Sequence, residues 1–223
     1  LDYASDTTAG IERAFLVNGT DRFGGMSAAA NALGVGLKGA ASNTSFTNVP
    51  VGTGYGYFAG GQTAAPANVS TIERVDYSND TPTASVKGPL TSARYKIRGV
   101  SSTSHGYVGG GSPGSLSTID RIDYFSDTST ALHRTNLASA VLDHAGAGNA
   151  NYGYFAGGLP VSTVQRIEYA SDTANTVIRG PLSAARRYLA GMGNLNYGYF
   201  GAGTPGPGLF STIDRIDYSN DSA

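Results

Sequence analysis

The feature that most constrains this chain is a phrase of aromatic and glycine residues that occurs four times. YGYFAGG begins at Tyr55 and recurs as HGYVGGG at His105, YGYFAGG at Tyr152 and YGYFGAG at Tyr197. The steps between successive copies are 50, 47 and 45 residues. A period of this length is typical of repeat proteins, in which each unit buries its apolar face against its neighbours. The period of about 47 residues therefore constrains the fold before any single motif is considered.

Two further phrases recur in the same order within each period. STIERVDY at Ser70 has three later copies, and GPLTSAR at Gly88 returns as GPLSAAR at Gly180. Each unit holds four short β-prone stretches separated by turn residues. In the second unit these stretches are residues 95–100, 106–110, 118–124 and 130–134. Four strands per unit predict an all-β fold, a β-propeller, over the alternative of a β-solenoid, whose repeats are usually shorter.

The repeat predicts one domain of about four four-stranded blades, or an arc of a larger propeller. Residues 1–53 are expected to form a partial blade with a long loop insertion, because Tyr3 and Tyr77 lie 74 residues apart and about 27 residues are therefore extra, mostly within 7–53. The residues after Tyr3 could supply a missing outer strand and close a ring, so both readings stay open. The repeats are divided as 54–104, 105–150, 151–195 and 196–223.

Composition excludes several classes of function. The absence of Cys excludes disulfide scaffolds, thiolate zinc sites and Cys nucleophiles. A net charge of −1, from 15 basic and 16 acidic residues, argues against a nucleic-acid partner. No apolar run approaches the roughly 18 residues of a membrane helix, so no membrane insertion is expected. We expect no cofactor.

Charged residues recur on one face of the third strand of each unit. Alternate residues of a strand share a face, so Arg74 and Asp76 are close enough to pair, or to reach a neighbouring blade. The same column contains Arg121 with Asp123, Arg166 with Glu168, and Arg215 with Asp217. Four equivalent anion sites are one interpretation. We favour a structural ion-pair ladder that fixes the register of the blades, because a catalytic residue is rarely needed four times.

Two other interpretations of polar residues are weaker. The oxygen-rich turns that follow these strands, such as residues 76–80, could bind calcium, but side-chain capping of the turn explains the same residues, so no metal is expected. His105 replaces a repeated Tyr, and His133, Asp143 and His144 lie in the same unit. No nucleophile or metal-ligand spacing accompanies them, so the sequence predicts no catalytic residue and a non-enzymatic protein.

The linkers between the second and third strands vary in length, whereas the turns after the Asp-Tyr pairs are constant. The four linkers contain 8, 5, 3 and 7 residues, and alternating strands place them on one rim. A variable rim on a uniform scaffold is the usual place for recognition. The candidate ligand-binding residues are Gln62, Pro66, Asn68, Ser112, Pro113, Leu159, Pro205, Leu209 and Phe210.

The order of these phrases resembles the kelch repeat. An apolar run ending in Gly-Gly precedes an Ile/Val-x-Arg-x-Asp strand, a turn and a Pro-Leu-Ser-x-Ala-Arg link, although the Trp of the fourth kelch strand is missing and Val86 or Val177 stands there. The phrases YGYF, STIDRIDYSND and GPLSAAR are more similar to repeats of virion and tail-fibre-like proteins of marine bacteriophages, including cyanophages. Residues 54–223 follow this pattern throughout, and 7–53 follow it poorly.

The resemblance implies a structural module of a phage virion or tail fibre, located on the tail or surface of the particle and therefore extracellular. Its role would be display or adhesion to a host envelope, with a glycan or protein as ligand and multivalency compensating for weak contacts. Its partners would be other virion proteins or further copies of itself, because fibre proteins are commonly trimers. The alternative is a cellular kelch-like scaffold that binds another protein on the same rim.

Overall fold

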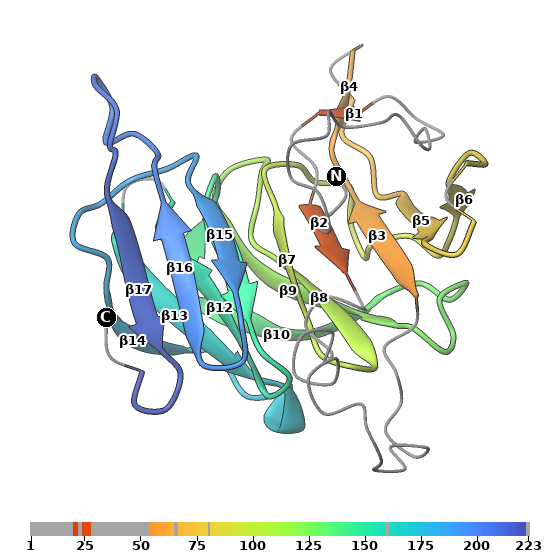
Figure 1. Ribbon diagram of the computed structural model, residues 1–223. Coiled ribbons are helices and arrows are strands. Elements are labelled where there is room, and N and C mark those ends of the chain that lie inside the picture. The colour runs from red at the N-terminus through yellow and green to blue at the C-terminus, as the bar shows by residue number, and fades with distance from the viewer. Residues whose placement is uncertain are drawn as a thin grey trace.

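The computed structural model describes residues 20–21, 24–27, 54–64, 67–79, 81–158 and 161–221, and they form an all-β structure (Figure 1). The first two sheets contain β2 (Gly24–Ser27), β3 (Tyr55–Ala59), β5 (Ile72–Asp76) and β6 (Ser85–Val86), then β7 (Arg98–Ser101), β8 (His105–Gly109), β9 (Leu116–Asp123) and β10 (Leu132–Val141). The next two contain β11 (Ala145–Gly148), β12 (Tyr152–Ala156), β13 (Thr163–Glu168) and β14 (Val177–Pro181), then β15 (Ala190–Gly193), β16 (Tyr197–Gly201) and β17 (Ile213–Asp217). A small sheet pairs β1 (Thr20–Asp21) with β4 (Gln62–Thr63), and a 3₁₀ turn, η1 (Tyr169–Ser171), follows β13.

Each of the four larger sheets is an antiparallel meander in which chain order equals spatial order. The second sheet follows the sequence prediction closely, except that its last strand continues to Val141 rather than ending near residue 134. Register shifts in the pairing of β10 with β9 accommodate this length. The sheets also begin one strand before each Tyr-Gly-Tyr phrase, so a division at residues 54, 105, 151 and 196 cuts every sheet after its first strand.

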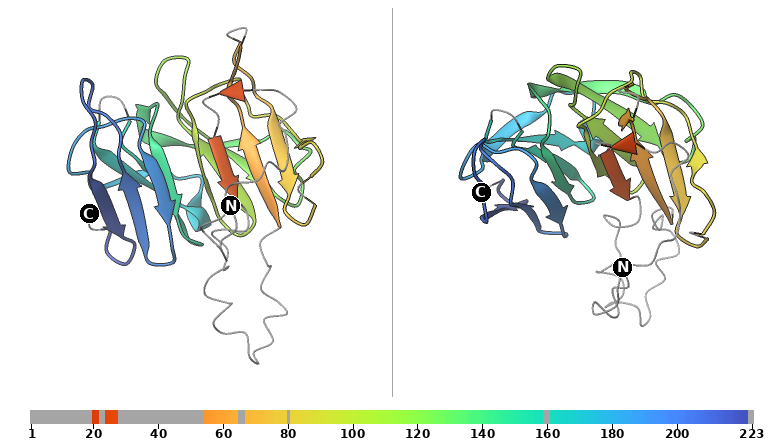
Figure 2. Two further views of the ribbon diagram at one scale, coloured as in Figure 1. Left: turned by 45° about the horizontal axis from the view of Figure 1, so that its top comes forward. Right: turned by 90° about the horizontal axis from the view of Figure 1, so that it is seen from above.

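The first strands of successive sheets contact one another in the order β2, β7, β11 and β15. Seen from above, the sheets follow one another around an arc, with the first and last sheets well apart (Figure 2). Glycines allow this close approach: a Cβ on Gly146 would lie 2.7 Å from the Gly99 carbonyl oxygen, and one on Gly191 would lie 2.3 Å from that of Gly146. The arrangement is compatible with a propeller.

The core lies between neighbouring sheets rather than within any one of them. Three clusters of buried side chains fill the three junctions of the arc. Ile122 and Tyr57, for example, belong to one cluster but to different sheets. Because a single sheet cannot bury both of its faces, each unit depends on its neighbours for stability.

The connections divide between two rims, because the strands alternate in direction. The rim that we call the turn rim has the connections between first and second strands and the turns after the third strands, and the linker rim has the rest. First and second strands are joined by three residues in the last three sheets (102–104, 149–151 and 194–196) but by 27 residues, 28–54, in the first. The extra length counted from the sequence is therefore placed at one connection of the turn rim.

Candidate functional site

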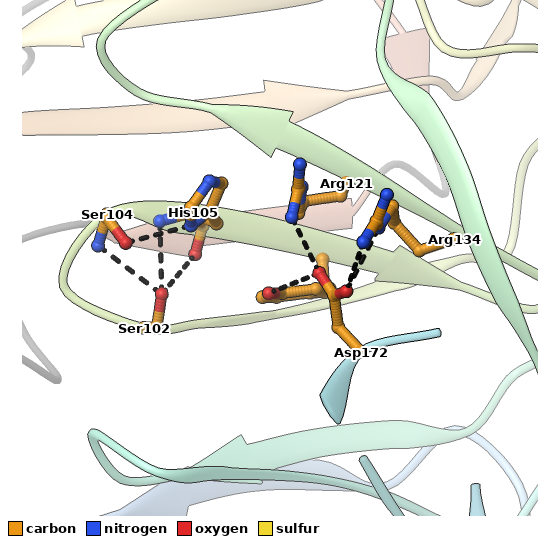
Figure 3. Close-up of polar contacts among 7 residues, drawn as sticks. Ser102, Ser104, His105, Arg121, Arg134 and Asp172 are labelled. Atoms are coloured by element: carbon orange, nitrogen blue, oxygen red, sulfur yellow. Dashed lines mark hydrogen bonds and ion pairs between the residues drawn. The ribbon is translucent and has the colours of Figure 1, made fainter. Parts of the chain in front are cut away.

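A carboxylate from the third sheet binds three side chains of the second sheet. Asp172, which follows η1, accepts hydrogen bonds from the Tyr107 hydroxyl at 3.0 Å and from Arg121 at 2.8 Å. Arg134 donates two more, at 3.0 and 2.7 Å (Figure 3). Burial alone would raise the pKa of Asp172, but the hydrogen bonds from Arg134, Tyr107 and Arg121 outweigh it and lower that pKa below its ordinary value. We call this arrangement the inter-sheet clamp.

The same clamp occurs at the two other junctions of the arc. Between the first and second sheets, the clamp consists of Asp127 with Tyr57 (3.0 Å), Arg74 (2.7 Å) and Lys87 (3.5 Å). Between the third and fourth sheets, it consists of Asp221 with Tyr154 (2.7 Å), Arg166 (2.7 Å) and Arg179 (3.2 Å). Since the same constellation recurs at each junction of the described arc, its role is to hold the sheets together.

Stacked tyrosine rings accompany each clamp. The Tyr of the turn lies on the Tyr of the preceding sheet, with centroids 4.8 Å apart for Tyr57 and Tyr124 and 4.9 Å apart for Tyr154 and Tyr218. Burial raises the pKa of Tyr124 and of Tyr218 above the ordinary value for tyrosine. The repeated tyrosines therefore pack between sheets, and the clamp combines an aromatic pair with a charged hydrogen-bond network.

The acidic partners that the sequence placed beside each arginine have a different role. Asp76 and Asp217 accept hydrogen bonds from the backbone N–H and hydroxyl of Ser78 and Ser219, and Asp123 accepts one from the backbone of Phe125. The carboxylates of these strand-end residues cap their own turns. The sequence left open whether each arginine pairs with the acidic residue of its own strand or reaches a neighbouring blade. Arg74, Arg121 and Arg166 reach the neighbouring sheet. Arg215 lies over the Tyr197 ring at 4.6 Å, and Glu168 is exposed.

The arginines of the Pro-Leu-Ser/Thr phrase are buried connectors of a second kind. Arg94 is 0% exposed, forms an ion pair with Asp120 at 3.0 Å and donates to the Val108 carbonyl at 3.1 Å. Arg186 binds Asp214 at 2.8 Å and the Phe200 carbonyl at 3.0 Å in the same way. Each arginine thus ties the link before a sheet to two strands of that sheet.

A pocket of about 400 Å³ opens on the turn rim, between the second and third sheets. Its lining includes Ser104, His105, Asn151, Tyr152, Glu168 and Tyr169. Aromatic faces beside hydroxyl, amide and carboxylate groups suit a polar ligand that carries hydroxyl groups. Two of these residues were identified from the sequence, His105 as a departure from the repeat and Glu168 as a member of the ion-pair ladder, and the other four were not. Ser104 and Asn151 belong to the short loops after the first strands, so a comparison of these loops between units could have found them.

His105 is the residue that distinguishes this place from its equivalents. In the other three units a Tyr stands here, and an arginine of the third strand lies over its ring at 4.0 Å (Arg74 on Tyr55) or 4.4 Å (Arg166 on Tyr152). Nδ1 of the smaller imidazole forms a hydrogen bond with the Ser104 hydroxyl at 2.8 Å. Burial, followed by the charge of Arg121, lowers the pKa of His105. A neutral imidazole at the pocket wall can both donate and accept a hydrogen bond.

The serines next to His105 form a turn rather than a catalytic pair. The Ser102 hydroxyl accepts hydrogen bonds from the backbone N–H groups of Ser104 and His105 (Figure 3). Asn149 and Asn194 make the same two bonds with their side-chain oxygens in the third and fourth sheets. The Ser102 interaction is therefore part of the repeat, and one difference at the pocket is His105, which stands where the other units have Tyr.

The other polar residues that break the repeat do not gather into a site. His133 contacts the carbonyl of Thr135, and Asp143 lies 3.2 Å from the Lys96 ammonium. His144 is fully buried, and burial followed by the charge of Arg98 lowers its pKa to about 3. Within the described ranges, no group of three His, Asp or Glu side chains could hold a metal ion, and the turns use their carboxylates for capping and for the clamps.

The candidates on the linker rim separate into packed and exposed residues. Gln62 and Asn68 bond to each other at 3.3 Å, and Ser112 is 6% exposed with its backbone paired to Tyr95. Phe210 packs beneath the guanidinium of Arg186. The exposed candidates are Pro113, Pro205 and Leu209, and Pro66 and Leu159 lie outside the described residues. Ser112 therefore presents little side chain to a ligand, while Leu209, at 90%, is fully accessible.

A scan against protein-family models gives no match for this chain, and a search of curated proteins gives none either. Among the residues that the structure describes, no helix has the length and apolar character needed to cross a membrane.

Proposed function

We propose that the chain is a non-enzymatic, kelch-like β-propeller module that serves in a phage virion or tail fibre for display or for adhesion to a host surface. The observation that carries this proposal is that the residues that join the sheets can be separated from those available to a ligand. The repeated charged and aromatic residues are used in the clamps and links between sheets. On the turn rim, His105 departs from the repeat and lines a pocket together with residues that follow it, and we assign recognition to this place.

The ligand that fits this proposal best is a glycan of the host envelope, bound in the His105 pocket. Tyr152 offers an aromatic face, and Asn151, Glu168 and Ser104 offer acceptors and donors around it. A shallow site of this kind binds weakly, and repetition on a particle would raise the avidity.

The pocket is tested with the variant His105→Tyr, because Tyr is the residue of the other three units and is compatible with the fold there. The larger ring narrows the pocket and should weaken binding of the chain to purified envelope polysaccharide by about tenfold or more, ~1.4 kcal/mol. Tyr197→His makes the reverse change in the fourth sheet and serves as the matched control. Equal binding by His105→Tyr and the wild-type chain would remove the pocket from the proposal.

The location is tested by gold labelling with an antibody to the chain, on particles from the source culture. Label at tail ends or fibres supports adhesion, and label over the capsid supports a role in decoration. Absence of label on any particle contradicts a virion protein. Co-purification of the chain with a single cellular protein would then favour a kelch-like scaffold.

A further inference from the structure

Of the four strand-end carboxylates that the structure describes, only that of Glu168 does not cap its own turn. Asp76, Asp123 and Asp217, at the equivalent position in the other sheets, accept a hydrogen bond at 2.9 Å from the backbone N–H two residues later. Glu168 makes no such bond, and the chain after it forms η1. The capping bond is typical of Asp and Asn, because a further methylene carries the carboxylate past the N–H. The turn therefore leaves the carboxylate of Glu168 unused.

This carboxylate belongs to the lining of the pocket on the turn rim. Glu168 is exposed, and within the described residues its side chain has no ion pair and no hydrogen bond. Because the pKa of His105 is lowered, its imidazole is neutral near pH 7, and Glu168 is then the one charged side chain among the residues that line the pocket. The arginines of the two nearest clamps are already bonded to carboxylates there. A ligand in the pocket therefore meets a single carboxylate that has no partner in the described structure.

A second residue that differs from its equivalents keeps this pocket open. Between the third and fourth sheets, the side-chain amide of Asn149 donates to the Leu195 carbonyl at 3.2 Å and so bridges the two neighbouring loops. The equivalent residues at the pocket are Ser102 and Ala150. The Ser102 side chain is shorter, and its hydroxyl bonds to the backbone of its own turn. The space between the two loops is therefore left open to a ligand.

We propose that the pocket is selective for neutral sugars and that Glu168 determines this selectivity, by accepting hydrogen bonds from two neighbouring hydroxyl groups of the ligand. An ionised carboxylate is an acceptor with two oxygens, which matches a pair of adjacent hydroxyl donors. The same charge repels the carboxylate, sulfate or phosphate groups of an acidic polysaccharide. A cationic sugar is disfavoured because the guanidinium of Arg166 lies over the ring of Tyr152, which lines the pocket, at 4.4 Å. The inference rests on the proposed adhesion to a host glycan and narrows its ligand.

The test is biolayer interferometry of the chain on immobilised dextran, mannan, galactan and polygalacturonate. The wild-type chain should bind at least one of the three neutral polymers and should not bind polygalacturonate. Glu168→Asp keeps the charge, but the shorter side chain should cap the turn as Asp217 does and withdraw from the pocket. This variant should bind the same neutral polymer at least about tenfold more weakly. Its urea midpoint should stay at or above that of the wild-type chain, so the loss of binding is not a loss of folding.

Asp217→Glu is the matched control, because it makes the opposite change at the equivalent position of the fourth sheet and should bind as the wild-type chain does. Glu168→Gln keeps the length of the side chain without its charge, so it should lose the discrimination against polygalacturonate. Equal binding by Glu168→Asp and the wild-type chain would overturn the role of Glu168. Wild-type binding to polygalacturonate would overturn the selectivity but leave adhesion to a glycan in place. Binding to none of the four polymers would overturn this inference, and the proposed adhesion fails only if purified envelope polysaccharide is not bound either.

Discussion

The stretch before β7, residues 94–97, and the stretch before β11, residues 141–144, occupy the same place in the repeat. They differ in which of their buried positions is polar and which is apolar. Before β7, Arg94 is fully buried against Asp120. Before β11, Val141 stands in the place of Arg94 and Gln165 in the place of Asp120, with both ends of the Gln165 amide bonded to the backbone of Ser139. The charge is absent from both partners together, as expected for a structural pair, because an unpaired buried charge is costly.

A second position in these two stretches shows the reverse exchange. Ile97 is apolar and 0% exposed, whereas His144 at the equivalent position is buried edge-on to Phe155, with ring centroids 5.7 Å apart. Neither ring nitrogen of His144 has a hydrogen-bond partner among the described residues. The stretch before β7 is therefore polar at its first position and apolar at its second, and the stretch before β11 is the opposite.

The largest effect is expected for Arg94→Met. The substitution leaves the buried Asp120 carboxylate with only its bonds to Thr91 and removes the bond to the Val108 carbonyl. Loss of one partner of a buried pair costs about 3–5 kcal/mol, so the free energy of unfolding should fall by about 3 kcal/mol or more in urea denaturation. The control Arg179→Met, at a side chain that is 34% exposed, should cost about 1 kcal/mol or less. Equal losses in the two variants would contradict a special role for the buried pair.

The paired change Arg94→Val with Asp120→Gln copies the chemistry before β11 into the stretch before β7. Because no charge is then buried, the double variant should regain most of the stability that Arg94→Val loses, with a coupling energy of about 2–3 kcal/mol in a double-mutant cycle. The cycle requires the two single variants and the double variant, all measured at one pH. Additive losses would mean that the two sites are energetically independent. The joint change from Arg94 and Asp120 to Val141 and Gln165 would then not reflect a coupled pair.

His144→Leu tests the second position through the pH dependence of stability. The unfolded imidazole binds a proton near pH 6.5, but the buried one does so only near pH 3, so protonation of the unfolded state destabilises the fold as the pH falls from about 6.5 towards 3. This group alone accounts for about 2 kcal/mol of lost stability at pH 5. The leucine variant should lack that loss, and the exposed His133→Leu should keep it. Parallel pH curves for His144→Leu and the wild-type chain would exclude this titration.

The sequence was sufficient to predict the strands and their order, because each strand of the repeat is set by a local pattern that recurs. Residues 105–109 and 116–123, for example, form strands where the phrases HGYVG and STIDRID predict them. The partner of each clamp could not be derived in this way. Asp127 and Asp172 belong to turns, and only the packing of one sheet on the next brings them to Arg74 and Arg121.

The pocket was missed for the same reason. It lies between two sheets and combines a loop of one with strand ends of the other, so no single stretch of sequence contains it. His105 was identifiable because it departs from the repeat, whereas Asn151 and Tyr152 follow it. The linker rim, chosen for its variable lengths, includes the exposed Leu209 but also the buried Ser112, because length variation does not report burial.

The smallest effect is expected for Lys96→Met, which tests whether the two stretches support each other. The Lys96 ammonium lies 3.2 Å from the Asp143 carboxylate, and the Asp143 N–H donates to the Lys96 carbonyl at 3.3 Å. Both residues have a positive φ, 59° and 57°, and Met at 96 does not change that backbone cost. Since Arg98 still acts on Asp143 and the backbone bond remains, the loss should be about 1 kcal/mol in urea denaturation. A loss as large as that of Arg94→Met would show that the contact between the stretches, rather than the chemistry inside each one, dominates this part of the fold.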